Sequence, residues 1–138
     1  MKTNRVGITA VAVFAVMFVY EWLVHSVLLS NIYATTPQLW RPKTEICHHF
    51  HFMIAGYVFY ALFFTVIFSK GFEKSKPSLE QGYRFGMLMG LLLGPISGFG
   101  WYAIMPISFN LAVAWFAACF IENLLLGLTA GLVYKPSK

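Results

Sequence analysis

The sequence predicts an all-α protein that folds as a four-helix transmembrane bundle, and three observations lead to this prediction. Of the 138 residues, 59% are hydrophobic and only 11% are charged, too few to cover a soluble surface. Four apolar stretches are each long enough to cross a hydrocarbon core about 30 Å thick. In the third stretch glycine recurs at every fourth position, a spacing typical of helices that pack closely in lipid. We expect one membrane domain, residues 1–138, made of two helical hairpins.

The predicted spans are joined by short connections. They are Val6–Ser30, Ile46–Ser69, Gly82–Met105 and Phe109–Tyr134. Eight basic residues lie near the chain ends and around the second connection: Lys2, Arg5, Lys70, Lys74, Lys76, Arg84, Lys135 and Lys138. The first connection holds only two basic residues, Arg41 and Lys43. Because cytoplasmic segments of membrane proteins carry an excess of Lys and Arg, both termini are predicted to be cytoplasmic. Bases spread in this way over the ends of spans argue against a nucleic-acid-binding protein.

The first span is apolar until it reaches Glu21 and His25 in its outer half. The connection after it, residues 31–45, is rich in the amphipathic aromatic residues expected at lipid headgroups. The second span opens with a histidine-rich stretch, Cys47–His51. Cys47 and Cys119 are predicted to differ in depth by roughly 10 Å, too far for a disulfide.

Glycine organises the last two spans. The third span carries Gly82, Gly86, Gly90, Gly94 and Gly98, and the fourth carries Gly127 and Gly131. Five glycines would cost a helix in water roughly 1 kcal/mol each against alanine, so the pattern favours close packing of one helix on another, a glycine zipper. Pro95 interrupts the third span, and a kink is expected there unless Ser97 or a neighbouring helix satisfies the backbone.

Polar residues inside the spans are the candidates for a functional site. They are Glu21, His25, His51, Glu122 and Asn123. An ionisable residue within a bilayer is costly and is a functional-site hypothesis by default. Two carboxyl groups at similar depth repel when both are ionised, so at least one is expected to be protonated or to share a proton or cation. Glu21, His25, His51 and Glu122 offer oxygen and nitrogen ligands for a transition metal, and the two histidines offer axial ligands for a haem.

A structural interpretation of the same residues stays open. Glu21, protonated and hydrogen-bonded to Asn123 or His25, would fix the register of two helices without any chemistry. No phosphate loop, nucleophile elbow or zinc-protease motif is present, and no catalytic residue is predicted.

Several segments of the chain resemble a group of small bacterial four-helix membrane proteins with no established activity. The resemblance rests on residues 21–25, 39–42 and 105–109 and on Glu122 with Asn123. It implies the same four-helix fold and the bacterial inner membrane as the location.

The leading functional hypothesis is a non-enzymatic accessory or assembly subunit, or a homo-oligomer built on the glycines, because packing signals are strong and chemical ones sparse. The alternative is a redox protein that binds a metal ion or haem through the Glu and His residues. A small-solute or proton pathway along the glutamates is a third hypothesis. The expected partners of the protein are the lipid bilayer and either other copies of the chain or a larger membrane complex.

Overall fold

The computed structural model describes residues 2–134, and every regular element in that range is helical. Four helices are long and apolar enough to cross a membrane: Asn4–Leu28, Lys43–Lys70, Ser78–Ile104 and Phe109–Val133. The prediction of an all-α chain with four spans is confirmed, and the helices begin and end within a few residues of the predicted bounds. These four helices indicate an integral membrane protein.

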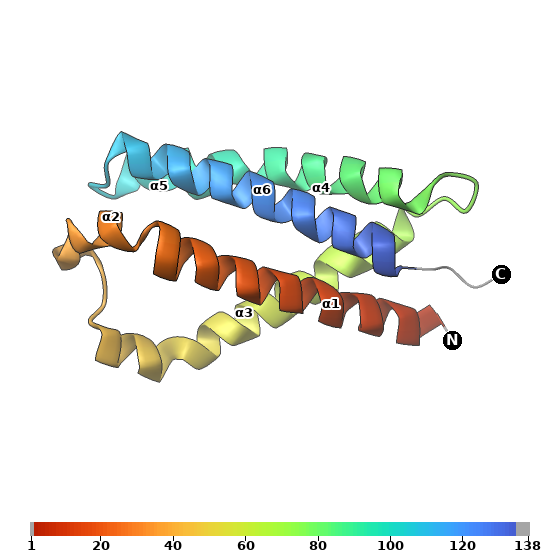
Figure 1. Cartoon of the computed structure of the whole chain (residues 1–138), viewed down its shortest axis with the longest axis horizontal. Helices are drawn as coiled ribbons and strands as arrows, with labels where there is room; N and C mark the ends of the chain where they lie inside the picture. The colour runs from red at the N-terminus through yellow and green to blue at the C-terminus, as the bar shows by residue number, and fades with distance from the viewer. Residues whose placement is uncertain (1, 135–138) are drawn as a thin grey trace.

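Short helical segments interrupt or connect the long helices. The first half of the chain forms α1 (Lys2–Trp22), the π-helix η1 (Leu23–Leu28), α2 (Ser30–Ala34), the 3₁₀-helix η2 (Pro37–Leu39) and α3 (Lys43–Lys70). The second half forms α4 (Ser78–Pro95), the π-helix η3 (Ile96–Gly100), α5 (Trp101–Ile104) and α6 (Phe109–Val133). The first and third spans thus each contain a π-helical segment near the same end of the molecule (Figure 1).

Residues at the helix starts explain where the later long helices begin. Pro42 and Pro77 are the N-cap residues of α3 and α4, where proline is tolerated because the first turn has no intrahelical N–H bond to lose. Ser108 caps α6, and its Oγ accepts a hydrogen bond from the backbone N–H of Leu111 at 3.2 Å. Each start therefore has a local cause in the sequence.

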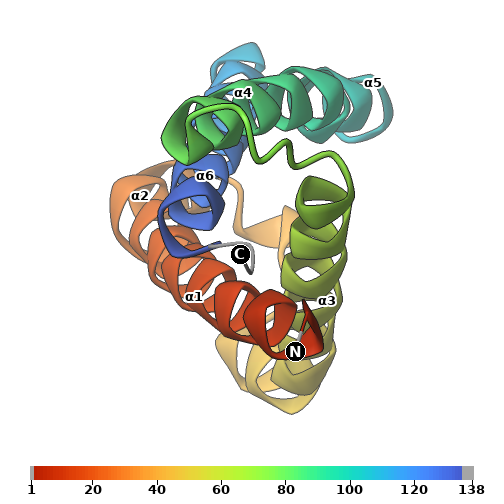
Figure 2. The same ribbon diagram turned by 90° about the vertical axis from the view of Figure 1, so that its right-hand side faces the viewer.

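The four long helices run back and forth along the long axis, so the start of α1 and the end of α6 lie at the same end (Figure 1). Viewed from that end, α6 lies between α4 and α1, and α3 stands beside α1 (Figure 2). The most extensive packing is between α4 and α6, and α1 packs on both α3 and α6. The first and last spans are therefore neighbours.

Glycine lines the interface between α4 and α6. All five glycines of the third span are buried there; Gly82 and Gly86 lie opposite Gly127 and Gly131. A Cβ atom added to Gly86 would lie 2.4 Å from the carbonyl oxygen of Asn123, and one added to Gly98 would lie 2.4 Å from that of Ala112. The two backbones are therefore in direct contact at these positions.

Contact between α3 and α4 is made mainly by side chains, although the two helices are consecutive. The Phe64 and Phe85 rings pack edge to face with centroids 4.8 Å apart. Phe64 and Phe68 belong to a buried apolar cluster with Val13 of α1 and Leu126 of α6. A second buried cluster, which includes Val24 and Leu111, lies nearer the end that holds α2.

Pro95 ends α4, and the chain continues as the π-helix η3. The Ser97 hydroxyl donates to the carbonyl oxygen of Gly94 at 2.9 Å and lies 3.5 Å from that of Trp115 on α6. The Ser97 hydroxyl therefore bonds to the carbonyl oxygen of Gly94 and not to that of Leu91, the carbonyl that a proline at position 95 leaves without its helical donor.

Candidate functional site

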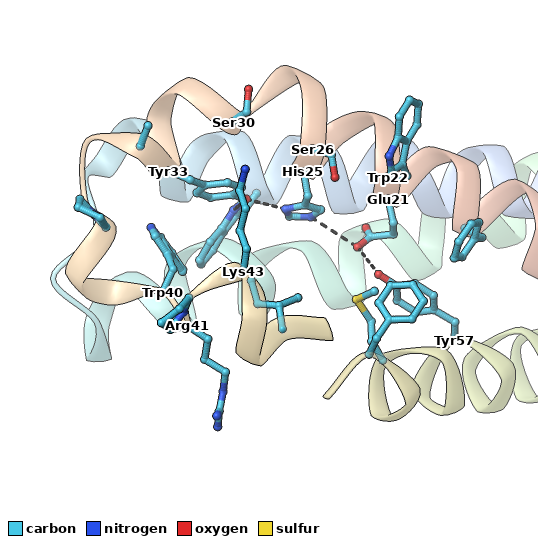
Figure 3. Close-up of a pocket in the computed structure, with 18 residues that line it drawn as sticks. Glu21, Trp22, His25, Ser26, Ser30, Tyr33, Trp40, Arg41, Lys43 and Tyr57 are labelled. Atoms are coloured by element: carbon cyan, nitrogen blue, oxygen red, sulfur yellow. Dashed lines mark hydrogen bonds and ion pairs between the residues drawn. The ribbon is translucent and has the colours of Figure 1, made fainter. Parts of the chain in front are cut away.

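A cavity of about 1080 Å³ opens between the first span, its connection and the start of α3 (Figure 3). Its apolar walls come mostly from large side chains: Phe18, Trp22, Trp40, Ile46, Phe50 and Met53. Its polar lining includes Glu21, His25, Tyr33, Lys43 and Tyr57, and Trp115 contributes from α6. Ligand pockets in proteins have this composition, with apolar walls and a few placed polar groups.

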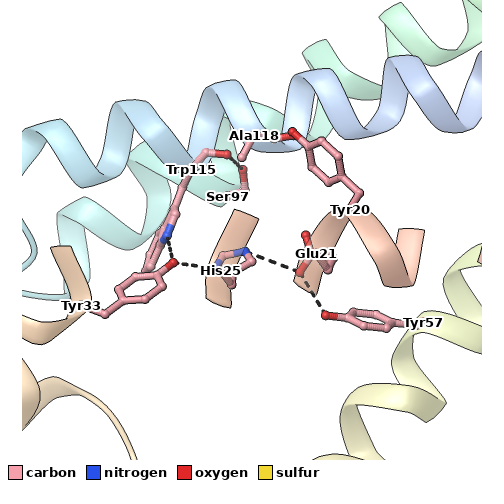
Figure 4. Close-up of polar contacts among 8 residues, drawn as sticks. All are labelled: Tyr20, Glu21, His25, Tyr33, Tyr57, Ser97, Trp115 and Ala118. Atoms are coloured by element: carbon pink, nitrogen blue, oxygen red, sulfur yellow. Dashed lines mark hydrogen bonds and ion pairs between the residues drawn. The ribbon is translucent and has the colours of Figure 1, made fainter. Parts of the chain in front are cut away.

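A row of hydrogen-bonding side chains forms one wall of the cavity (Figure 4). Glu21 Oε2 accepts a hydrogen bond from the Tyr57 hydroxyl at 3.0 Å and lies 3.5 Å from His25 Nε2. His25 Nδ1 lies 2.5 Å from the Tyr33 hydroxyl, which accepts the indole N–H of Trp115 at 2.8 Å. The row therefore joins α1, the π-helix η1, α2, α3 and α6 through side chains alone.

Donor chemistry fixes one direction in this row. The indole N–H of Trp115 only donates, so the Tyr33 oxygen accepts it. The direction of the contact between the Tyr33 hydroxyl and His25 Nδ1 depends on the tautomer of the imidazole. At the other end of the row, Glu21 Oε2 accepts from Tyr57 and faces His25 Nε2.

The second oxygen of Glu21 belongs to a side chain that lines the cavity. Within residues 2–134, Glu21 Oε1 has no hydrogen bond, and the side chain keeps 22% of its surface exposed. Glu21 Oε1 is therefore an acceptor without a donor, next to a row of side chains that are already hydrogen-bonded to one another.

The π-helix η1 sets the position of His25. Its wider turn is visible in the hydrogen bond from the Leu29 N–H to the Val24 carbonyl oxygen at 2.9 Å, five residues apart. Single π-helical turns inside α-helices occur often at functional sites. The stacked His25 and Tyr33 rings, with an interplanar angle of 3°, lie next to this segment.

Two basic residues lie at the mouth of the cavity. Figure 3 shows Lys43 extended from the first turn of α3 toward Tyr33 and His25, whereas Arg41 points away from them. Arg41 is paired with Glu45 at 3.5 Å. Burial raises the pKa of Tyr33 above its usual value; the Trp115 N–H acts in the opposite direction, and the charge of Glu21 raises the pKa further.

Glu122 and Asn123 form a separate polar group inside the bundle. Asn123 is 1% exposed; its Oδ1 accepts a hydrogen bond from Tyr60 of α3, and its Nδ2 donates to the Cys119 carbonyl oxygen at 2.9 Å. Tyr20 of α1 donates to the Ala118 carbonyl oxygen at 2.9 Å one helical turn away (Figure 4). Tyrosines on two helices thus hold α6 in place near Glu122.

The structure brings some of the candidate residues together and leaves others apart. Glu21 and His25 share the cavity wall, but His51 is exposed on α3, where its ring lies 4.2 Å from that of Phe52. The sequence left Asn123 and His25 open as hydrogen-bond partners of Glu21. Asn123 bonds to Tyr60 instead, and only His25 lies beside Glu21. Among residues 2–134, no three His, Cys, Asp or Glu side chains are grouped in a way that could hold a metal ion. Cys47 and Cys119 are unpaired, as predicted.

Sequence reasoning missed the tyrosines and tryptophans of the site. The sequence predicts the aromatic residues of the first connection, Tyr33 and Trp40 among them, only as interfacial residues, and it does not single out Tyr57 and Trp115. The one available signal was their content of hydroxyl and indole groups, because Tyr and Trp usually have a hydrogen-bond partner when buried. Comparison with models of known families, with curated proteins and with solved structures finds no match. The resemblance to small bacterial four-helix proteins therefore stays a prediction.

Proposed function

We propose that this chain is a non-enzymatic membrane protein that binds an amphiphilic molecule in the cavity. The observation that carries the proposal is the hydrogen-bonded row Glu21, His25 and Tyr33 along one wall of an otherwise largely aromatic cavity. A soluble ligand would gain little from so many apolar walls, and a pure hydrocarbon would leave the acceptor Glu21 Oε1 unpaired. A molecule with a polar head and an apolar tail satisfies both parts.

We propose that such a molecule lies with its head at Glu21 and its tail between α1 and α3. Its head donates a hydrogen bond to Glu21 Oε1, so it carries a hydroxyl or an ammonium group. Its tail lies between α1 and α3, where Phe18, Phe50 and Met53 line the cavity and still expose 36%, 41% and 39% of their surface. The aromatic side chains give the tail a large apolar contact area.

Tryptophan quenching tests this proposal directly. Trp22, Trp40 and Trp115 line the cavity, whereas Trp101 does not. We expect a long-chain alcohol or amine with a bromine on its chain to quench the fluorescence of the protein in lipid vesicles saturably. The same chain with a methyl-ester head, which only accepts hydrogen bonds, is expected to quench weakly and without saturation.

Matched variants separate the cavity from the surrounding lipid. Trp40→Phe should remove part of the saturable quenching, and Trp101→Phe should leave it intact. Glu21→Gln should weaken binding of the amine most, because it removes the negative charge and keeps the shape. Equal quenching by alcohol, amine and ester, or no change in Glu21→Gln, would count against a binding site in this cavity.

An accessory or assembly role stays a prediction and is compatible with ligand binding. The glycines of α4 and α6 face each other within one chain, so a homo-oligomer would have to use other faces than the predicted one. Crosslinking in lipid, followed by mass measurement, tests this: species larger than one chain would support an assembly role, and a protein that stays strictly monomeric and without a partner would count against it.

We further propose that the end of the bundle holding both termini faces the cytoplasm of a bacterial inner membrane. The support is the uneven distribution of basic residues, of which only Arg41 and Lys43 lie in the connection beside the cavity. In this orientation the cavity lies in the outer half of the membrane, and its ligand enters from the outer leaflet.

A further inference from the structure

Glu122 is a carboxyl group without a partner in the core of the bundle. Its side chain belongs to the buried face of α6, with 7% of the residue exposed. Its Oε1 atom is inaccessible and has no hydrogen bond to any residue that the structure describes. It does not line the cavity described above, so the proposed ligand does not account for it.

The groups around Glu122 do not stabilise a negative charge. Those that interact with it electrostatically are Tyr20 and Glu21 on α1, Tyr57 and Tyr60 on α3 and Cys119 on α6 itself. All five are acids, which are neutral or negative and never positive. Tyr20 and Tyr60 direct their hydroxyl hydrogens elsewhere, to the Ala118 carbonyl and to Asn123. No ion pair involves Glu122 among residues 2–134.

Glu21 is in the opposite situation. Its side chain lines the cavity and is 22% exposed, and one of its oxygens accepts a hydrogen bond from Tyr57 and faces His25. A buried carboxyl group with an unpaired oxygen is far less costly when neutral than when charged. Two carboxyl groups whose surroundings differ in this way divide into one base and one acid.

We propose that Glu122 is a proton-binding site, in which the carboxyl group holds one exchangeable proton that the negative charge of Glu21 helps to retain. The ligand of this site is the proton itself, bound between α1, α3 and α6 near the middle of the last span. When the proton leaves, it passes to water and leaves a carboxylate, and no other bond changes. The Glu21 and Glu122 pair then carries two negative charges in place of one.

Infrared spectroscopy of the protein in lipid nanodiscs tests this proposal without any ligand, so its outcome is independent of the amphiphile hypothesis. The chain has only five side-chain carboxyl groups, and Glu45, Glu73 and Glu80 are exposed. We expect the carbonyl band of one protonated carboxylic acid at neutral pH, with a shift in D₂O that reports proton exchange. The band should be absent in Glu122→Gln.

Glu21→Gln completes the test, and it remains decisive if Glu122→Gln fails to fold. In Glu21→Gln the band should persist at neutral pH but disappear at a lower pH than in the wild type, because the neighbouring negative charge is gone. Loss of the band in Glu21→Gln at all pH values would assign the proton to Glu21 and overturn the proposal. So would absence of the band in the wild-type protein, or its persistence in a folded Glu122→Gln.

Discussion

Trp115 of α6 donates its indole N–H to the hydroxyl of Tyr33 at 2.8 Å, although the two residues lie 82 positions apart in the chain. Trp40 completes the contact, because its ring lies 5.0 Å from the Tyr33 ring and 6.1 Å from the Trp115 ring. These three aromatic residues fix the first connection on the last helix. The cavity wall therefore depends on α6 as well as on the helices on either side of the cavity.

Removing the indole donor should change the titration of Tyr33. Burial already raises the pKa of Tyr33 above 10.0, and the Trp115 N–H opposes this because it stabilises the phenolate. Trp115→Phe should therefore raise the pKa further. The pKa of Tyr33 is measured from phenolate absorbance. For the wild type and for Trp115→Phe, the absorbance of the same protein with Tyr33→Phe added is subtracted. Trp101→Phe is the control and should not alter the Tyr33 titration.

The same shift has a consequence for stability. Since the pKa of Tyr33 is higher in the folded than in the unfolded chain, its contribution to stability is fully present below pH 10.0 and is lost as the pH rises through the folded value. In Trp115→Phe this loss should begin at the same pH, which the unfolded chain sets, but it should continue to a more alkaline pH and become larger. A loss that ends at a lower pH than in the wild type would contradict the stabilisation of the Tyr33 phenolate by the Trp115 N–H.

Tyr60→Phe tests the polar contact inside the bundle. The change removes the hydroxyl that donates to Asn123 Oδ1 and leaves that buried oxygen without a partner. A lost donor of this kind costs about 1–3 kcal/mol. Unfolding in mixed detergent micelles measures the loss. Tyr83→Phe on α4, where the residue is 46% exposed, is the matched control and should change stability by less than about 0.5 kcal/mol.

The helices of this protein could be predicted because their causes are local. Length and hydropathy define the spans, and the i, i+4 spacing places Glu21 and His25 on one face, where they lie 3.5 Å apart. Counting residues along a helix gives the depth of a residue in the membrane, but it does not give the direction in which the side chain points around the helix axis. For this reason the sequence offered His25 and His51 together as axial ligands for a haem, whereas the structure leaves His51 exposed on α3 and outside the cavity lining.

The rest of the site depends on tertiary packing. The π-helix η1 has no mark in the sequence, since its hydrogen bonds differ from those of an α-helix only in register. Tyr57 reaches Glu21 from 36 positions away, and Trp115 reaches Tyr33 from α6. Such partners follow from how the helices are arranged around one another, which a single sequence without related sequences does not specify.

Membrane orientation is open to a reporter experiment. A reporter enzyme fused after Lys138 is expected to be active on the cytoplasmic side, and one inserted near Gln38 on the outer side, because the basic residues favour that orientation. A cysteine-reactive, membrane-impermeant label provides a second measurement, since Cys47 is exposed at the cavity end. Labelling of Cys47 only from the cytoplasmic side would reverse the proposed orientation and move the cavity to the inner half of the membrane.

Substitutions of glycine separate packing from membrane insertion most clearly. A Cβ atom on Gly86 would meet the backbone oxygen of Asn123 at 2.4 Å, whereas one on Gly90 would meet Phe120, partly through its mobile ring, at 2.9 Å. We expect Gly86→Ala to destabilise the protein by about 1–3 kcal/mol, Gly90→Ala by less, and Gly90→Val more severely than Gly90→Ala. Thermal unfolding in detergent gives this order.

Gly56→Ala is the matched control on α3, because nothing lies within 4 Å of the added methyl group. Alanine in a helix interior is favoured over glycine by about 0.5–1 kcal/mol, so this variant should be equal to or more stable than the wild type. If Gly86→Ala were as stable as Gly56→Ala, the backbones of α4 and α6 would have to be farther apart than described. The close contact between these helices would then not hold the fold together.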